Sequence, residues 1–293
     1  QLNRSIAVAR DRHLLGQGIL GTAFDYDIEV VTGAGSYVCG EETALLRSLE
    51  GLRGMVTARP PFPAERGLFG QPTVVNNVET LANIGWIIRQ GGDAYASIGM
   101  AKSRGPKTVC LNERFVYPGI YEVPLGTPVD FILNEIGGGM KTKKAIKAVQ
   151  IGGPLGGILP NRLLSTPLGF EELDAVGALL GHGGIVAWDD SVNARDIALH
   201  LFEFCDAESC GKCVPCRIGC RRGLELVRRM QRQSSAEAMR RDVETLTALC
   251  ETMKYGSLCA HGGGIPAPIA SLLLHFQDEM TAVVDSTQNR GRS

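Results

Sequence analysis

The sequence predicts a multidomain protein of mixed α/β and α+β class whose last part is helical. A chain of 293 residues is about twice the usual size of a single domain, so we expect two or three compact units. The first third alternates between strand-like and helix-like segments, and the middle carries short strands between turns. From Asn193 onward the pattern is helical. We therefore divide the chain into residues 1–104, 105–190 and 191–293.

Composition excludes several classes of function. Thirty Lys and Arg residues face 31 Asp and Glu residues, which leaves a formal charge of −1. This near-neutrality argues against broad electrostatic attraction to nucleic acid or anionic lipid. No run approaches the roughly 18 consecutive apolar residues of a membrane helix. We expect a soluble, cytoplasmic protein with no nucleic-acid partner and no direct membrane insertion. The chain begins at Gln1 without a basic and apolar leader, so we expect a piece of a longer protein.

The first unit opens with a helix, a strand, a glycine loop and a second helix. Apolar residues at a loose helical spacing predict the first helix over Arg4–Leu15, and alternation predicts the strand at Asp25–Thr32. The loop Gly33–Gly40 then leads into Glu41–Glu50, which is rich in strong helix formers and has two acids in its first turn. The order is therefore strand, glycine loop, helix.

A proline-rich loop and another helix complete the first unit. The loop spans Arg59–Pro63, and a short strand is predicted at Thr73–Asn77. Its last two residues are asparagines, either of which suits the N-cap of the helix predicted at Val78–Gln90. The glycine-bounded segment Gly91–Gly105 indicates the boundary to the next unit.

The middle unit is predicted to be a small α+β unit and the last unit to be helical. The strands expected in the middle are Lys107–Leu111, Gly119–Val123, Lys147–Ile151 and Gly184–Trp188, with a helix at Pro128–Ile136. The helices expected at the end are Ala194–Cys205, Arg222–Gln231, Ala236–Lys254 and Ile269–Val284.

Three of the nine cysteines, Cys210, Cys213 and Cys216, form a C-x2-C-x2-C motif. Thiols at this spacing suit a loop that wraps one compact metal centre, and disulfides between such close neighbours would be strained. Structural zinc sites usually take their thiolates as two separated pairs, whereas three close cysteines with a distant fourth are typical of bacterial ferredoxins. The motif therefore favours an iron–sulfur cluster, with zinc as the alternative.

The fourth ligand has several candidates, which are Cys205, Cys220, Cys250 and Cys259. Cys220 completes a ferredoxin-like spacing, but Arg221 follows it where that pattern has proline. Cys259 lies in a glycine-rich loop between two helices that could fold back over a cluster, so we prefer Cys259. The other two lie at helical spacing among apolar neighbours, and we expect them in the core together with Cys39 and Cys110.

The glycine loop Gly33–Gly40 is not the dinucleotide-binding fingerprint, because an apolar residue stands at its third glycine position. Such a loop still lets backbone amides approach a flat or anionic ligand. Glu41 and Glu42 at the helix start argue against phosphate. Either they stabilise the helix dipole, or they meet hydroxyls or amides of a ligand. Asn76 and Asn77 have the same ambiguity, as helix caps or as amide partners of a heteroaromatic ring.

Four segments together resemble the NADH-binding flavoprotein subunit of respiratory complex I. They are Gly33–Leu46, Pro60–Pro63, Val75–Ala82 and Ser209–Cys216, and they occur in the family's order. The family includes the diaphorase subunits of soluble NAD-linked formate dehydrogenases and hydrogenases. The segments Arg217–Gly219 and Gly181–Asp190 look most like the β subunit of NAD-dependent formate dehydrogenases.

The resemblance implies FMN, NAD and a [4Fe-4S] cluster as cofactors. The family exchanges hydride between NAD(H) and FMN and passes electrons singly to or from the cluster, without a catalytic side chain. A formate dehydrogenase is the narrower expectation, and complex I or an NAD-linked hydrogenase is the alternative. A zinc-binding or redox-silent structural module is the alternative from another class. The implied partners are a small [2Fe-2S] thioredoxin-like subunit and a larger iron–sulfur subunit, which carries molybdenum in formate dehydrogenases.

The resemblance also implies which residues bind the cofactors, because they stand at positions that match the family's sites. Those that match the FMN pocket are Gly40, Glu41, Glu42, Val75, Asn76, Asn77 and Thr80. Those that match positions near the nicotinamide nucleotide are Glu42, Arg59 and Phe62. Those that match the cluster ligands are Cys210, Cys213, Cys216 and Cys259.

The family's architecture implies a Rossmann-like FMN and NAD domain, a ubiquitin-like β-grasp domain and a helical bundle that carries the cluster. The sequence departs from the family in two respects. The family usually has lysine where this chain has Arg59, which keeps the charge and changes the hydrogen-bonding geometry. An earlier glycine-rich flavin motif of the family has no counterpart here, so we expect only part of the flavin domain.

Overall fold

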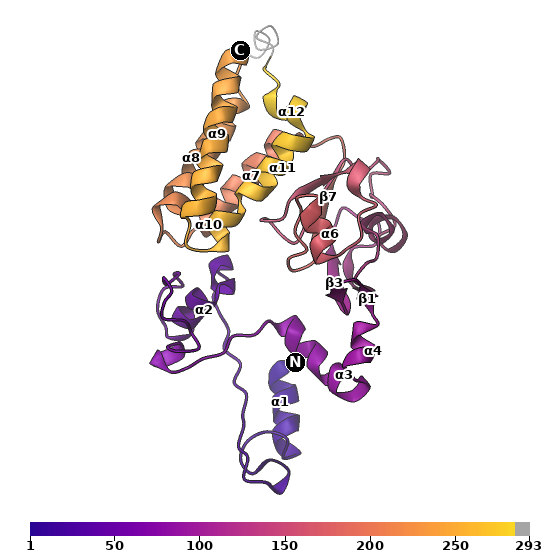
Figure 1. Cartoon of the computed structure of the whole chain (residues 1–293), viewed down its shortest axis with the longest axis vertical. Coiled ribbons are helices and arrows are strands. Elements are labelled where there is room, and N and C mark those ends of the chain that lie inside the picture. The colour runs from indigo at the N-terminus through magenta and orange to yellow at the C-terminus, as the bar shows by residue number, and fades with distance from the viewer. Residues whose placement is uncertain (285–293) are drawn as a thin grey trace.

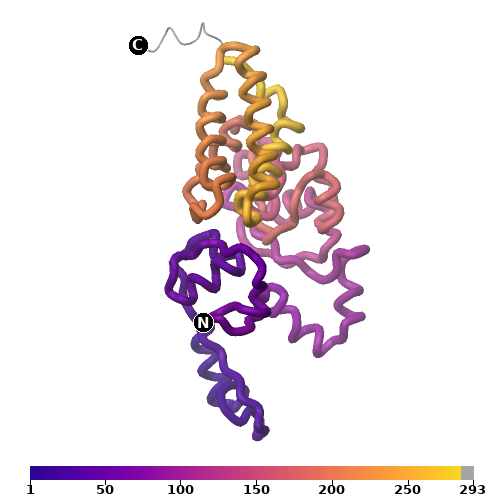
Figure 2. The backbone as a smooth tube through the Cα atoms, turned by 60° about the vertical axis from the view of Figure 1, so that its left-hand side comes forward, coloured from indigo at the N-terminus to yellow at the C-terminus, as the bar shows by residue number. Residues whose placement is uncertain are grey.

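The computed structural model describes residues 1–284. The chain forms an elongated molecule with a helical bundle at one end and the N-terminal segments at the other (Figures 1 and 2). A five-stranded sheet lies beside the bundle (Figure 1). The result is a mixed α and β architecture, as the sequence predicts.

Short helices joined by extended chain make up the N-terminal segments. They are α1 (Leu2–Asp11), η1 (Ile19–Gly21), η2 (Tyr37–Gly40), α2 (Glu42–Leu49) and η3 (Leu68–Gly70). The first two predicted helices are confirmed, with small shifts of their ends. The strands predicted at Asp25–Thr32 and Thr73–Asn77 were wrong. The first segment forms only an isolated antiparallel bridge, between Tyr26 and Gly16, and the second has no strand partner. Alternation alone does not make a strand when no neighbouring chain continues the ladder of hydrogen bonds.

Helix α3 (Val78–Gln90) has the predicted bounds, and the Asn77 side chain caps it by accepting from the Glu79 amide at 2.7 Å. Helix α4 (Gly92–Ala96) and the hairpin of β1 (Gly99–Met100) and β2 (Ser103–Arg104) follow. Glu79 ties α3 to the sheet, because its carboxylate accepts from Lys107 Nζ at 2.5 Å and from the Thr108 amide at 3.3 Å. No side chain of α3 is buried by the described residues.

The sheet has the strand order β4-β3-β7-β5-β6, in which only β3 and β7 pair in parallel. Its strands are β3 (Pro106–Leu111), β4 (Gly119–Pro124), β5 (Ala148–Ile151), β6 (Ile158–Pro160) and β7 (Gly184–Trp188). The four predicted strands are confirmed. The sequence did not predict β6, which is three residues long and buried throughout, so it shows no alternation.

Short helical segments complete the sheet unit. The predicted helix near Pro128 is confirmed as α5 (Val129–Phe131) followed by a π turn (Ile132–Ile136). A 3-10 turn, η5 (Asn161–Leu163), and α6 (Phe170–Ala175) were not predicted.

The helical bundle consists of α7 (Ala194–Glu208), α8 (Val214–Met230), α9 (Ala236–Gly256), α10 (Ala260–Gly264), α11 (Pro266–His275) and α12 (Gln277–Thr281). Helix α8 begins at Val214 and not at the predicted Arg222, so that Cys216 and Cys220 lie in a helix and not in a loop. The single helix predicted at Ile269–Val284 is broken at Phe276 into α11 and α12. Among residues 1–284 we find no helix whose length and apolar character would let it span a bilayer.

The sheet and the bundle are joined by polar contacts as well as by a shared apolar core. The Ile158 amide of β6 donates to Ser271 Oγ of α11 at 2.8 Å, and both groups are buried. Lys147 Nζ lies 2.7 Å from the Glu279 carboxylate of α12. The apolar core of the bundle also includes Ala148 and Ile158 of the sheet.

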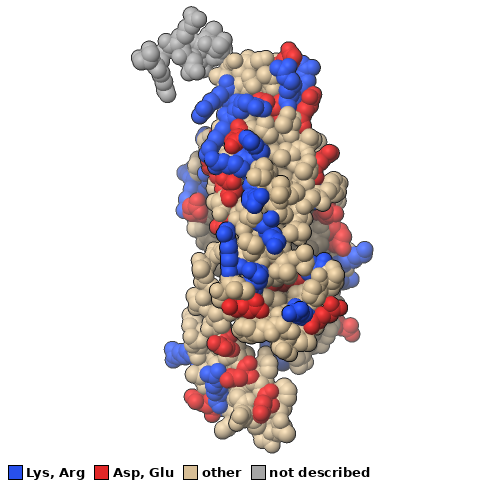
Figure 3. Space-filling model, turned by 90° about the vertical axis from the view of Figure 1, so that its left-hand side faces the viewer, with Lys and Arg blue, Asp and Glu red and all other residues tan. Residues whose placement is uncertain are grey.

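The surface of the bundle is rich in cations even though the whole chain is near neutral. Figure 3 shows Lys and Arg side chains gathered over the bundle. On α8, Arg221 and Arg228 pair with Asp206 and Glu203 of α7, at 3.1 and 3.0 Å. Exposed pairs of this kind each contribute little to stability, about 0–1 kcal/mol.

Gly223 allows α7 and α8 to approach closely, and we predict that Gly223→Ala destabilises the protein. A Cβ at this position would lie 2.1 Å from the ring of Phe202, which is fully buried. Overpacking typically costs about 1–3 kcal/mol. Urea unfolding followed by circular dichroism measures the effect. Gly85→Ala in α3 is the control, since its Cβ would meet only Arg89 Nη1 at 3.5 Å. Equal stabilities of the two variants would contradict the packing argument.

Candidate functional site

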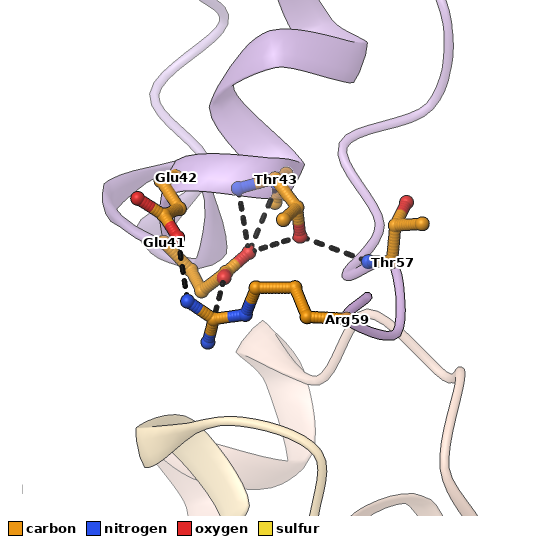
Figure 4. Close-up of polar contacts among 6 residues, drawn as sticks. Glu41, Glu42, Thr43, Thr57 and Arg59 are labelled. Carbon is orange, nitrogen blue, oxygen red and sulfur yellow. Dashed lines mark hydrogen bonds and ion pairs between the residues drawn. The ribbon is translucent and has the colours of Figure 1, made fainter. Parts of the chain in front are cut away.

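Glu41 stands between the glycine loop and α2, and one of its oxygens caps the helix. Oε2 accepts from the amides of Thr43 and Ala44, each at 3.0 Å, and from the Thr43 hydroxyl at 2.5 Å (Figure 4). The Thr57 amide in turn donates to Thr43 Oγ1 at 2.8 Å. These contacts satisfy amides that the helix itself leaves without partners. The helix-stabilising interpretation therefore holds for this oxygen.

The other oxygen of Glu41 takes no part in capping α2. Oε1 is buried and has no hydrogen-bond partner among the described residues, with Arg59 Nη2 3.9 Å away. Arg59 Nη1 contacts Glu42 Oε1 at 2.5 Å, and both of these side chains are about one-third exposed (Figure 4). A buried carboxylate oxygen without a donor is costly, and the arrangement therefore fits a donor supplied from outside the chain.

The predicted nucleotide residues are only partly brought together. Glu42 and Arg59 form the ion pair just described. The ring of Phe62 is 52% exposed, which leaves a face open for aromatic contact. An exposed aromatic ring can stack on a flat heterocycle.

The second group of predicted flavin residues lies in a different hollow. Asn77 lines a cavity of about 510 Å³ between α3 and the sheet, together with Asn83 and His182. Thr43 lines a separate cavity of about 390 Å³ beside α2. Val75, Asn76 and Thr80 flank Asn77, and the latter two are exposed. The structure thus places Gly40, Glu41 and Glu42 in one place and the asparagine group in another.

The four cysteines that match cluster ligands come from three separate segments. Cys210 follows α7, Cys213 is the N-cap residue of α8, Cys216 lies in the first turns of α8, and Cys259 is the N-cap residue of α10. Cys210 and Cys259 pack against a small apolar core, which consists of Val38, Ala44 and Val56. This core includes a residue of the glycine loop. The chain therefore brings two of the four cysteines that match cluster ligands against the segment that matches the flavin loop.

The electrostatics at these cysteines favour metal binding. Hydrogen bonds from the Cys220 thiol and the Ser209 hydroxyl lower the pKa of Cys216 to about 6 against the effect of burial. Burial raises the pKa of Cys259, while the backbone amides of His261 and Gly262 oppose this rise. Thiolates are the form that binds metal, so donors aimed at sulfur fit ligand positions.

Of the cysteines that were expected in the core, Cys205 and Cys250 are buried there and Cys110 is not. Cys205 and Cys250 are buried, and burial raises the pKa of each to about 12. Cys110 was expected in the core, but it is exposed because β3 alternates and turns Val109 and Leu111 inward instead. Cys39 is half-buried against the same small core as Cys210 and Cys259.

Tyr37 and His261 connect the glycine loop to the cysteine cluster, and sequence reasoning missed both. The ring of Tyr37 lies 5.0 Å from that of Phe204 and 5.8 Å from that of His261, measured between centroids. The Tyr37 amide also donates to Glu208 Oε2 at 3.0 Å. A large aromatic residue inside a glycine loop, and a histidine two residues after Cys259, were the available signals.

Two family models match the chain. The model described as "Nuo51 FMN-binding domain" matches residues 1–86. The model described as "NADH-ubiquinone oxidoreductase-F iron-sulfur binding region" matches residues 196–283. The first range contains the glycine loop and the asparagine group, and the second contains the three cysteines of the C-x2-C-x2-C motif and Cys259.

Curated relatives match nearly the whole chain. The "NADP-reducing hydrogenase subunit HndC" of Solidesulfovibrio fructosivorans is 43% identical over 97% of this chain and 58% of its own length. An NADH-quinone oxidoreductase F-type subunit of Rhizobium meliloti is 39% identical over 97% of this chain and 67% of its own length. Its counterpart in Escherichia coli is 40% identical over 96% and 63%. The chain thus spans about three-fifths to two-thirds of the length of these relatives.

A solved structure shares the fold. A chain of the "NAD+-reducing [NiFe]-hydrogenase in the H2-reduced state" superposes with a TM-score of 0.80 at 34% identity. The match covers 89% of this chain and 44% of the other.

Proposed function

This chain belongs to the family of NADH-oxidoreductase flavoprotein subunits, and we propose from that membership that it is part of a diaphorase subunit. Such a subunit exchanges hydride between NAD(H) and FMN and passes electrons to or from a [4Fe-4S] cluster. The observation that carries the proposal is the position of Cys210 and Cys259. Both pack against the small core that the glycine loop shares, so that one compact region contains residues for both electron carriers.

Each residue of the region has a defined task in this proposal. Cys210, Cys213, Cys216 and Cys259 hold the cluster. Glu41 fixes the start of α2 through Oε2 and presents Oε1 to a donor of the flavin or the nucleotide. Arg59 positions the Glu42 carboxylate, and the exposed ring of Phe62 stacks on the nicotinamide nucleotide. When bound, the flavin supplies two-electron chemistry with the nicotinamide, and the cluster supplies one-electron transfer.

The asparagine group belongs to the same proposal. In this proposal Gly40 and the two glutamates contact the flavin from one side, and Val75, Asn76, Asn77 and Thr80 contact it from the separate cavity described above. Asn77 caps α3 through Oδ1 alone, so its amide nitrogen and the exposed side chains of Asn76 and Thr80 are the groups that meet a ligand in this proposal.

We also propose the family's three domains for this chain. They are part of a Rossmann-like flavin domain over residues 1–104, a β-grasp domain over 105–190 and the cluster-bearing bundle over 191–293. The complex is a soluble NAD-dependent formate dehydrogenase of the cytoplasm, with a small [2Fe-2S] subunit and a larger iron–sulfur subunit as partners. An NAD-linked hydrogenase or complex I is the alternative, and the relatives named above are subunits of an NADP-reducing hydrogenase and of NADH-quinone oxidoreductases.

The cofactors are tested by purifying the chain without oxygen. We expect a brown protein whose visible absorption is bleached by dithionite, with equal amounts of iron and acid-labile sulfide. Charge-transfer absorption of this kind requires thiolate-bound iron. A colourless protein that contains stoichiometric zinc, and that takes up no cluster when the zinc is removed and iron and sulfide are added, would instead support the structural-module alternative and overturn the proposal.

A further inference from the structure

Three buried side chains converge beside the proposed cluster. The Cys216 and Cys220 sulfurs and a ring nitrogen of His261 all lie within 4.8 Å of one another. Each residue is at most 5% exposed. Cys220 and His261 are outside the ligand set that the family implies, so this group needs its own explanation.

The spacing of the two sulfurs fits a single metal ion. Cys216 and Cys220 are one helical turn apart on α8, and their sulfurs are 3.9 Å apart. Two thiolates bound to one tetrahedral ion, each at about 2.3 Å, are about 3.8 Å apart. The two sulfurs therefore match ligands of the same ion without a change in the helix.

His261 has one ring nitrogen that is free to bind a metal. Its Nε2 lies 3.0 Å from the Cys205 carbonyl oxygen, which can only accept, so Nε2 carries the proton. Nδ1 then has a free lone pair, and it is buried without a hydrogen-bond partner among residues 1–284. Histidines that bind metals commonly donate their other N–H to a backbone carbonyl in this way. The ring also packs against Tyr37 and Phe204.

We propose that Cys216, Cys220 and His261 form a second metal site, which binds a single zinc-like divalent ion when the cluster is absent. Water supplies the fourth ligand, as in zinc sites that have three protein ligands. Cysteine and histidine in this ratio are a standard zinc donor set. Cys216 is shared, so the ion and the cluster exclude each other. This last point rests on the proposed function.

The site is tested by titrating the cluster-free full chain with Co²⁺ under reducing conditions. We expect one Co²⁺ per chain, with the intense visible bands of tetrahedral thiolate coordination. Cys220→Ser and His261→Gln are each expected to weaken binding about tenfold or more. Cys259→Ser and the buried control Cys250→Ser are expected to leave the affinity unchanged. Circular dichroism confirms that each variant is folded. Affinity that depends on Cys259 and not on Cys220 would place the ion at the cluster ligands and overturn the proposal.

The competition is tested separately. One equivalent of Zn²⁺, added before iron and sulfide, is expected to block cluster reconstitution in the parent chain and not in Cys220→Ser. Full reconstitution of the zinc-loaded parent overturns the shared-ligand site. A chain that binds Co²⁺ through Cys220 but never accepts a cluster supports the zinc site and overturns the proposed function, so the two are distinguishable.

Discussion

Replacing Cys259 by serine is expected to abolish the [4Fe-4S] cluster, whereas Cys220→Ser is expected to leave it in place. Cys259 packs against the same small core as Cys210, and the backbone amides of His261 and Gly262 oppose the rise in its pKa that burial causes. Cys220 is fully buried in the core of the bundle and does not pack against the small core that Cys210 and Cys259 share. A serine hydroxyl is a poor substitute for a thiolate ligand, so the loss should be nearly complete.

Electron paramagnetic resonance of the dithionite-reduced protein, together with iron content, measures the outcome. Cys250→Ser is the matched control, since that cysteine is also buried, in α9, but is outside the cluster of thiols. An intact signal from Cys259→Ser, with loss of the signal from Cys220→Ser, would reverse the assignment of the fourth ligand.

Much of the fold could be predicted because most elements carry a local signal. Helix α3 has its asparagine cap and its apolar spacing, and both ends of the helix were predicted. Strand β6 could not be found by alternation, because every residue in it is buried. The early start of α8 was signalled by Pro215, which is favoured in the first turn of a helix, but the cysteine motif suggested a loop.

The candidate site was harder to predict because its contacts join distant parts of the chain. The cysteine spacing pointed to a metal centre by itself. In contrast, the packing of Tyr37 against His261 and the separation of the asparagine group from Glu41 are tertiary features. The two oxygens of Glu41 also have different surroundings, which no sequence pattern distinguishes. Both interpretations of that residue, helix cap and ligand partner, are therefore compatible with one side chain.

Glu42→Gln in the complete protein is expected to lower NADH-linked dye reduction about tenfold in kcat/KM, which corresponds to about 1.4 kcal/mol. The substitution keeps the shape of the side chain but removes the charge that Arg59 contacts at 2.5 Å. Arg59 then keeps only the more distant Glu41 carboxylate, 3.9 Å away, and its guanidinium is less firmly positioned for the nucleotide. If the pair only binds the nucleotide, the change appears in KM, and if it orients the nicotinamide, kcat falls as well.

Glu65→Gln is the control for Glu42→Gln, because Glu65 is an exposed acid that follows the same proline-rich loop. Flavin content is measured in both variants, so that loss of cofactor is separated from loss of nucleotide binding. Unchanged kinetics with normal flavin content would mean that Glu42 acts only as an acid in the first turn of α2. Its effect would then be limited to helix stability, where a charge near the N-terminus typically contributes about 0.3–1 kcal/mol. A selective fall in Glu42→Gln would place this carboxylate, through Arg59, at the nucleotide.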